Sequence, residues 1–242
     1  MIEKPLVIIP TYNEIENISQ IIKAVFNLPE YFNILIVDDG SPDGTAQAVK
    51  DLIKNYPDRL FILERSSKLG LGSAYLTGFK WALERDFTHV FEMDADFSHN
   101  PKDLPKMYRE SVENKTDLVI GSRYVSGVNV VNWPMSRVLL SYGASKYVRF
   151  ITGMPINDTT AGFVCYTRQL LQKIDLEKIK FVGYAFQIEM KFKAYLLGCT
   201  FKEIPVIFTD RTKGNSKMSK GIIREAVFGV IQMKIKSILK LI

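Results

Sequence analysis

The sequence predicts an α/β fold built on a doubly wound, mostly parallel sheet. Two observations carry this prediction. Short apolar runs alternate with segments in which apolar residues have helical spacing, and polar clusters rich in turn-forming residues follow several of the runs. This alternation is typical of β-α units, in which ligand-binding loops follow the carboxyl ends of parallel strands. With 242 residues, the chain is long enough for one large domain with a full-sized core.

The first half of the chain shows the alternation most regularly. The apolar run 6–9 ends at Pro10, and apolar residues at positions 15, 18, 21, 22, 25 and 26 predict the first helix. The same pattern then repeats. It predicts strands at 6–9, 32–37, 60–63, 89–93 and 118–120, and helices at 15–26, 46–56, 72–85 and 104–114.

The second half is less regular and is predicted to continue the same domain. A helix is expected at 137–151, with strand-like runs at 162–166 and 204–208. Residues 220–242 have apolar residues at helical spacing with five basic residues between them, which predicts a basic amphipathic helix. Such a helix either lies at a membrane surface or packs on the core of its own domain, and the sequence leaves both open.

Composition narrows the classes of ligand and partner. The chain has 32 Lys and Arg against 26 Asp and Glu, and the formal charge of +6 suits a phosphate-bearing ligand or an anionic membrane surface. It has no motif that resembles an RNA- or DNA-reading module, so no nucleic-acid partner is expected. Its two cysteines form no CxxC pair, which argues against a zinc or redox motif. We expect neither a secretory signal nor a transmembrane helix.

Asp94 and Asp96 stand where the strand predicted at 89–93 ends. Side chains two residues apart on an extended segment point the same way, so both carboxylates can contact one cation. Hard oxygen ligands of this kind suit Mg2+ or Mn2+ that also contacts phosphate oxygens. Taken alone, such a short acidic run also fits a solvated turn.

Two further polar loops follow the first two strands. Residues 10–14 offer an aromatic ring, an amide and a carboxylate to a nucleotide base, although a helix N-cap would use similar residues. Asp38 and Asp39 precede a tight turn rich in Gly and Pro, where a carboxylate can accept hydrogen bonds from a base or a ribose. An ordinary β-α turn has the same composition.

The loop at 70–74 is neither a Walker A loop nor a dinucleotide fingerprint, which argues against ATPases and dehydrogenases.

Four segments, read in chain order, carry a resemblance to a known family: PTYNE, DDGSPDGT, KLGLGSAY and MDADFSH. They resemble the family 2 glycosyltransferases of GT-A fold, and within these the dolichol-phosphate (polyprenyl-phosphate) mannose synthases. The resemblance continues through GSRYV, NWPMSR, DTTAGF and GYAFQIEM to EIPVIFTDRTKGNSK, so it covers about residues 5–219. It implies a GT-A catalytic domain over 1–219, with a Rossmann-like nucleotide-binding half followed by an acceptor-side half, and the amphipathic helix over 220–242.

The resemblance also implies a donor site and a metal site. The nucleotide sugar would contact Pro10, Tyr12, Glu14, Val37, Asp39, Asp94, Ala95 and Asp96. The metal, Mg2+ or Mn2+, would be bound by Asp94, Asp96 and Ser98. Relatives can carry Gln at the position of Ser98, and because the serine hydroxyl is a shorter ligand, a water molecule can take its place.

An acceptor phosphate needs several basic donors that converge on it. By the resemblance these donors are Arg123, Arg137, Arg211 and Lys217, with Ser141 one helical turn beyond Arg137. The expected catalytic residues are Asp94, Asp96 and Arg123.

The implied reaction is the inverting, metal-dependent transfer of mannose from GDP-mannose to a polyprenyl phosphate, without a general base. One alternative keeps the fold but uses another sugar nucleotide, such as UDP-glucose, or a hydroxyl acceptor. A second alternative is a nucleotide-binding or membrane-surface scaffold without catalysis. The expected location is the cytoplasmic face of a membrane, where the protein would be peripheral and held by its C-terminal helix or by a membrane partner protein.

Overall fold

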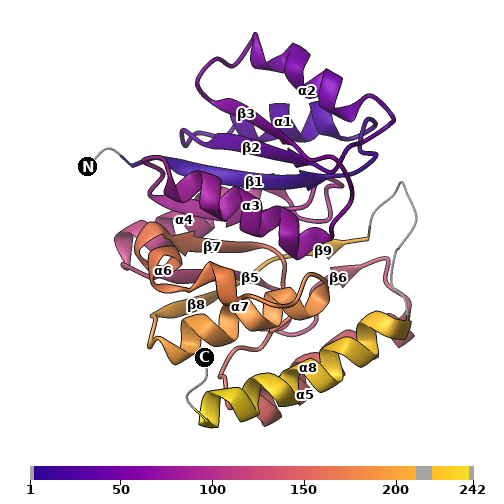
Figure 1. Ribbon diagram of the computed structural model, residues 1–242, viewed down its shortest axis with the longest axis vertical. Helices are drawn as coiled ribbons and strands as arrows, with labels where there is room; N and C mark the ends of the chain where they lie inside the picture. Colours follow the sequence, from indigo (N-terminus) through magenta and orange to yellow (C-terminus); the bar gives the residue numbers. More distant parts are fainter. Residues whose placement is uncertain (1–2, 211–219, 240–242) are drawn as a thin grey trace.

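A seven-stranded sheet forms the centre of the computed structural model, which describes residues 3–210 and 220–239 (Figure 1). The strand order is β3-β2-β1-β4-β7-β5-β8, and a second small sheet pairs β6 with β9. The strands are β1 (Pro5–Thr11), β2 (Asn33–Asp38), β3 (Leu60–Glu64), β4 (His89–Glu92), β5 (Leu118–Ser122), β6 (Val130–Val131), β7 (Val164–Thr167), β8 (Phe201–Pro205) and β9 (Phe208–Thr209). The helices are α1 (Ile18–Phe26), α2 (Thr45–Ile53), α3 (Leu71–Leu83), α4 (Leu104–Glu113), α5 (Met135–Thr152), α6 (Arg168–Lys173), α7 (Tyr184–Leu196) and α8 (Lys220–Ile238). The predicted α/β class with a mostly parallel sheet is confirmed.

One strand of the large sheet runs against its neighbours. β7 is antiparallel to both β4 and β5, whereas the other neighbouring strands of this sheet are parallel. At the start of β7, Val164 lies opposite Glu92 of β4 and Ile120 of β5. The segment before β7 therefore lies at the carboxyl ends of β4 and β5.

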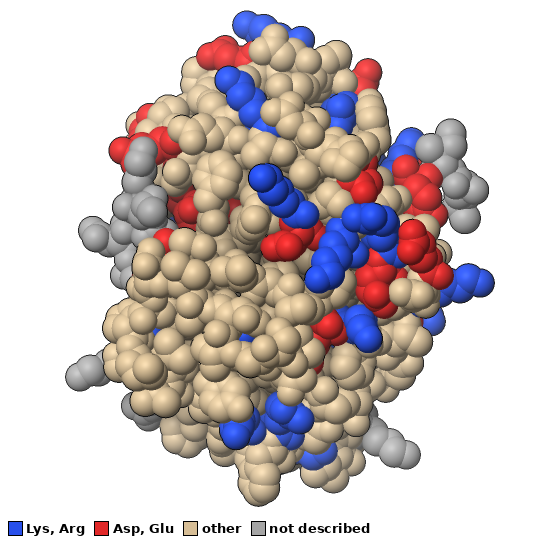
Figure 2. Space-filling view, turned by 180° about the vertical axis from the view of Figure 1, so that it is seen from behind, with Lys and Arg blue, Asp and Glu red and all other residues tan. Residues whose placement is uncertain are grey.

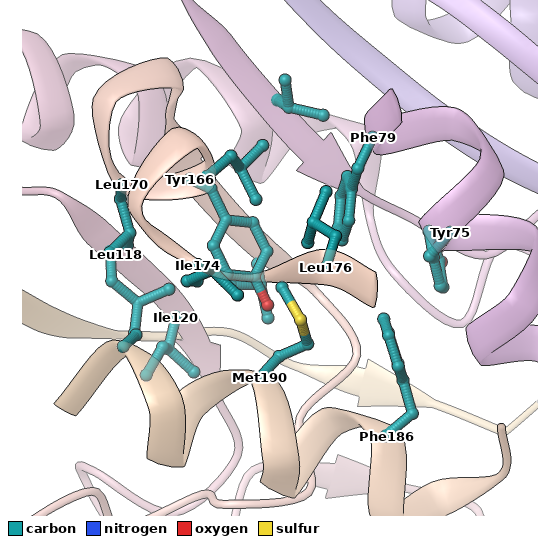
Figure 3. Packing of buried hydrophobic residues seen from close by; sticks show 14 of the residues in the cluster. Tyr75, Phe79, Leu118, Ile120, Tyr166, Leu170, Ile174, Leu176, Phe186 and Met190 are labelled. Atoms are coloured by element: carbon teal, nitrogen blue, oxygen red, sulfur yellow. The ribbon is translucent and has the colours of Figure 1, made fainter. Parts of the chain in front are cut away.

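Helices cover both faces of the sheet and bury alternate side chains of its strands. In β1, Leu6 and Ile8 belong to a core cluster with α3, α6 and α7, and Val7 and Ile9 belong to a second cluster with α1, α2 and α4. This division follows from the two-residue period of a strand, and sheets buried on both faces have continuous apolar strands for that reason. Figure 3 shows the first cluster around Tyr166 of β7.

The structure differs from the sequence predictions mainly in the second half. The strand predicted at 204–208 is wrong in its limits, because β8 ends at Pro205 and the chain then pairs with β6 through β9. Pro205 is tolerated where it stands because β8 is an edge strand and the proline has no amide hydrogen to donate. The helices α6 and α7 and the short strand β6 were not assigned from the sequence pattern.

The C-terminal helix packs along one side and is exposed on another. α8 lies beside α5 (Figure 1), and the hydroxyl of Tyr147 in α5 donates to the carbonyl oxygen of Val227 at 3.0 Å. Val230 and Met233 extend the first core cluster, whereas Phe228 is 63% exposed. Both interpretations of the amphipathic pattern thus have a physical basis. Within residues 3–210 and 220–239, no helix is long and apolar enough to cross a membrane.

Candidate functional site

The loops after β1, β2 and β4 lie next to each other because β1 is between β2 and β4 in the sheet. The backbone amides of Asn13 and Glu14 donate to the hydroxyls of Ser41 and Thr45, each at 3.0 Å. These bonds fasten the loop after β1 to the loop after β2. The polar residues that follow the two strands are therefore presented together at one edge of the sheet.

The two aspartates after β2 have different surroundings. Asp38 is fully engaged in local structure, because its carboxylate accepts from the hydroxyl of Thr11 at 2.7 Å and from the hydroxyl and amide of Ser41 at 2.6 and 2.8 Å. Asp39 instead accepts from Nε of Arg65 at 2.7 Å. Nη1 of Arg65 in turn donates to Ser73 at 2.7 Å. Asp39 is thus a carboxylate held in one orientation, as a base- or ribose-binding group must be.

Arg65 is a site residue to which the sequence pattern assigned no role. It follows β3 directly, so its position at the carboxyl end of a parallel strand was the available signal. The other residues predicted for the nucleotide are close by. Nζ of Lys68 lies 4.6 Å from the ring centre of Tyr12. Pro10, near the end of β1, pairs with Val37 of β2. The Val37 side chain is fully buried in the core, which leaves its backbone for any contact with a ligand.

The aspartate pair lies on a loop whose backbone is held by hydrogen bonds to side chains of the same segment. Asp94 and Asp96 are partly exposed, whereas Ala95 and Ser98 between and after them are buried. The amide of Ser98 donates to Oδ1 of Asp96 at 3.0 Å. Among the described residues, no group of three or more His, Cys, Asp or Glu side chains could hold a metal ion. Two carboxylates are nevertheless a fitting set for Mg2+ or Mn2+ at a diphosphate, since such ions keep several waters and take the rest of their ligands from substrate phosphates.

His99 is the main support of this loop. Its Nδ1 accepts the backbone N–H of Asp94 at 3.1 Å, and its ring stacks on Phe163 with 4.9 Å between ring centres. Burial lowers the pKa of His99 to about 4, with the nearby Arg123 guanidinium acting in the same direction and the carboxylates of Asp96 and Asp158 opposing it. The imidazole is therefore neutral at pH 7, which is the form that can accept the Asp94 amide.

The neutral state of His99 predicts a specific acid sensitivity. Its pKa in the fold lies below the unfolded value, so its contribution to stability is complete above about pH 6.5 and is lost as the pH falls toward 4. In His99→Gln this contribution is absent. We expect the free energy of unfolding, measured by urea denaturation with chelator present, to fall up to about 3 kcal/mol further in the wild type than in the variant over this range. Parallel pH profiles for the two proteins would contradict this assignment.

Arg123 follows β5 and is paired with a buried carboxylate. Its Nε and Nη2 donate to the two oxygens of Asp158 at 2.7 and 2.6 Å, its backbone N–H donates to Asp158 at 2.9 Å, and Nη2 also donates to Thr160 at 2.8 Å. Burial alone would raise the pKa of Asp158, but the charge and hydrogen bonds of Arg123 outweigh it, so that this pKa is lowered. The bidentate pair fixes the plane of the guanidinium.

Two aromatic residues connect Arg123 with the rest of the candidate site. The guanidinium carbon of Arg123 lies 5.5 Å from the ring centre of Trp133 and 5.7 Å from that of Phe208. The same Phe208 ring packs edge-on against His99 at 5.4 Å, and Trp133 carries Arg137 over its face at 4.0 Å. Through these rings, the structure brings Arg123 and Arg137 near the loop that carries Asp94 and Asp96.

Of the remaining residues predicted to bind the acceptor phosphate, the structure describes Arg137 and Ser141. Arg137 donates to Asp210 at 2.8 Å and is about one-quarter exposed. Ser141 is one turn further along α5 and is half-buried. Arg211 and Lys217 lie outside the described residues, so their predicted contact with a phosphate stays a prediction.

Comparison with known sequences decides the family. The family model described as "Glycosyl transferase family 2" matches residues 6–175. The chain belongs to this family. It is 47% identical over 234 residues to a polyprenol monophosphomannose synthase of Mycolicibacterium smegmatis, covering 97% of this chain and 88% of that protein. It is 44% identical over 225 residues to an undecaprenyl-phosphate mannosyltransferase of Micrococcus luteus, covering 93% of this chain and 91% of that protein. The family 2 protein is thus a glycosyltransferase, as the sequence predicted.

Solved structures support the GT-A fold of this family 2 enzyme. A mannosyltransferase from Pyrobaculum calidifontis in complex with GDP-Man and Mn2+ matches with a TM-score of 0.61 and 17% identity. The match covers 98% of this chain and 64% of that one. A glucosyl-3-phosphoglycerate synthase from Mycobacterium tuberculosis, solved with Mn2+ and UDP, matches with a TM-score of 0.66 and 16% identity, covering 96% of this chain and 80% of that one. The predicted GT-A fold is therefore confirmed.

Proposed function

We propose that this enzyme transfers mannose from GDP-mannose to a polyprenyl phosphate with inversion of the anomeric carbon, giving a polyprenyl β-phosphomannose and GDP. The names of the relatives at 47% and 44% identity support the sugar and the class of acceptor. The observation that carries the proposal is the oriented guanidinium of Arg123 beside the aspartate loop, which suits a second phosphate opposite the diphosphate of the donor.

On the donor side, Asp39 is oriented by Arg65 and would accept hydrogen bonds from the base or ribose, with Tyr12 beside it. Asp94 and Asp96 would hold Mg2+ or Mn2+, with Ser98 or a water as a further ligand. When bound, the ion neutralises charge on the diphosphate that leaves. Pro10, Glu14, Val37 and Ala95 complete the proposed nucleotide contacts.

On the acceptor side, the proposed phosphate ligands are basic side chains and one hydroxyl: Arg123, Arg137, Ser141, Arg211 and Lys217. A phosphate monoester has a second pKa of about 6 and is therefore already ionised at pH 7. One of its oxygens can attack the anomeric carbon while the bond from that carbon to GDP breaks, so no proton has to be removed. The buried carboxylate of Asp158 is engaged with Arg123, and that of Glu203 accepts the backbone amides of Asn157 and Asp158.

The deciding experiment supplies Mg2+ or Mn2+, a short polyprenyl phosphate and one radiolabelled sugar nucleotide at a time. We expect label to enter the organic phase from GDP-mannose and not from UDP-glucose, with a β-linked product by NMR. Matched reactions with the unphosphorylated polyprenol should transfer nothing. Transfer from UDP-glucose alone, or to the polyprenol, would contradict the proposed donor or the proposed acceptor.

A membrane-embedded acceptor requires a surface that meets lipid, and we propose that α5 and α8 form it. α5 carries basic residues and no acidic ones, and its Met135, Leu139 and Phe150 are 70%, 65% and 87% exposed. On α8, Phe228 and Ile235 are more than half exposed. Figure 2 shows blue basic side chains set in tan surface at the end of the molecule where Figure 1 places these helices. Apolar side chains between basic ones are typical of a helix at an anionic membrane surface.

Peripheral membrane contact through these two helices predicts vesicle binding. Phe150→Ser combined with Ile235→Ser should lower co-sedimentation with vesicles containing anionic lipid by about 10-fold or more, since each substitution removes exposed apolar area that would enter the lipid. Transfer to a short-chain, water-soluble acceptor should be unchanged. Tyr31→Ser, which removes a side chain 66% exposed in the segment between α1 and β2, is the matched control. Equal vesicle binding by all three proteins would contradict the proposed surface.

A further inference from the structure

Lys191 lies in the middle of α7 and is completely buried. Burying an ammonium group is costly unless its protons meet acceptors. Nζ of Lys191 donates to the carbonyl oxygen of Ala161 at 2.6 Å, and to the backbone carbonyl and Oε1 of Gln187 at 3.2 and 3.1 Å. The hydrogen-bond acceptors of the ammonium group are therefore neutral oxygens from α7 and from the turn before β7, and its opposite charge is the nearby buried carboxylate of Glu92.

Gln187 extends this hydrogen-bond network to β4, the strand that ends two residues before Asp94. Its Nε2 donates to Oε2 of Glu92, a fully buried carboxylate at the end of β4 and two residues before Asp94. A chain of polar contacts thus runs from β4 through Gln187 and Lys191 to Ala161. Ala161 stands three residues after Asp158, the partner of Arg123.

The turn over 158–162 contacts both sides of the candidate site. At one end, Asp158 holds Arg123. At the other end is Gly162, where a Cβ would lie 3.8 Å from Nε2 of Gln187 and 3.8 Å from Cε1 of His99. His99 accepts the amide of Asp94. A shift of this one turn would therefore move Arg123 relative to the aspartate loop.

A core that served only stability would not need a charge at this position. Well-packed apolar residues in place of a buried ion pair are often neutral or stabilising. A satisfied polar network, in contrast, specifies one arrangement of its partners. We infer that Lys191 is a positioning residue for the transfer reaction, whose ammonium group fixes the turn over 158–162, and with it Arg123, relative to Asp94 and Asp96. This inference rests on the proposed function.

The test compares Lys191→Met with Lys193→Met. Methionine is unbranched and one heavy atom shorter than lysine, so it keeps most of the side chain but removes the donors and the charge. Lys193 is the matched control, because it is on the same helix, is 8% exposed and also donates to a backbone carbonyl, that of Lys178 at 3.0 Å, away from the turn. Each protein is assayed at a temperature at which circular dichroism shows it folded. For Lys191→Met we expect kcat/KM for the polyprenyl phosphate to fall about 10-fold or more, with the Kd of GDP changed less than about 2-fold. Lys193→Met should lower the melting temperature without this kinetic change.

If Lys191→Met does not fold, Glu92→Gln with Lys191→Met is compared with Glu92→Gln alone, because the double variant leaves no unpaired buried charge. The same fall in kcat/KM is expected between these two proteins. Acceptor kinetics that equal the reference within about 2-fold, or an equal loss in Lys193→Met, would overturn the inference. A wild type that transfers no mannose would instead overturn the proposed function, so the two failures are distinguishable.

Discussion

Asp96→Ala is expected to abolish metal-dependent transfer while leaving the protein folded. Asp96 is partly exposed on a loop, where its Oδ1 accepts the backbone N–H of Ser98 at 3.0 Å, so we expect its removal to leave the core intact. Under the proposed function the same carboxylate is a metal ligand beside the leaving diphosphate. Loss of such a group typically lowers kcat by about 100-fold or more. The measurement is turnover of GDP-mannose after chelation, with Mg2+ or Mn2+ added back in steps.

The metal titration separates loss of the ion from loss of the fold. Wild-type enzyme should lose activity in chelator and regain it with the added ion, whereas Asp96→Ala should stay inactive at every concentration. Asp51→Ala, which removes an exposed carboxylate from α2, is the control and should titrate like the wild type. A fully active Asp96→Ala enzyme would rule out the proposed metal site.

Asp158→Asn is expected to have the largest effect on stability. Asp158 is completely buried and is the bidentate partner of Arg123. Its neutralisation would leave the guanidinium, which is itself mostly buried, without its counter-ion. Removing one partner of a buried ion pair typically costs about 3–5 kcal/mol. Urea unfolding at pH 7 measures this difference, and transfer activity should fall with it because Arg123 is no longer held in one plane.

The pH dependence of the Asp158→Asn effect is a second check. The pKa of Asp158 is lowered in the fold, so the stability due to its charge is present above the unfolded pKa of about 3.9 and is lost as the pH falls through the folded value. The difference between wild type and variant should therefore shrink in strong acid. Glu64→Gln breaks the ion pair of Glu64 with Lys50, in which both side chains are nearly half exposed, and should cost less than about 1 kcal/mol. A loss of that small size in Asp158→Asn would show that Arg123 has another counter-ion.

The first half of the fold was predictable because its signals are local. Strands such as β1 and β2 are buried on both faces and read as unbroken apolar runs, and α1 shows a clear helical period beside them. The site residues Asp94 and Asp96 could be found in the same way, since they follow a strand of this kind. The same local patterns also predicted that the loops after β1, β2 and β4 lie together at the carboxyl ends of the strands.

The second half was less predictable because its polar residues are buried. In α7 the side chains of Gln187, Glu189, Lys191 and Lys193 are at most 8% exposed, so polar residues no longer mark the solvent side of the helix and the helical period is blurred. The pairs Asp39 with Arg65 and Arg123 with Asp158 join residues 26 and 35 positions apart. Their geometry depends on strand order, which one sequence does not reveal.

The reversed strand β7 sets apart one excursion of the chain, which lies between β5 and β7. Everything between the end of β5 and the start of β7, including β6 and α5, enters and leaves the sheet at a single edge, since Ile120 and Val164 stand opposite each other. This excursion carries Arg123, Arg137 and Ser141 but none of the residues proposed to contact the nucleotide. A relative could therefore adapt to a new acceptor through changes in the part of this excursion that precedes the turn over 158–162, while its strands β1 to β4 keep the same donor.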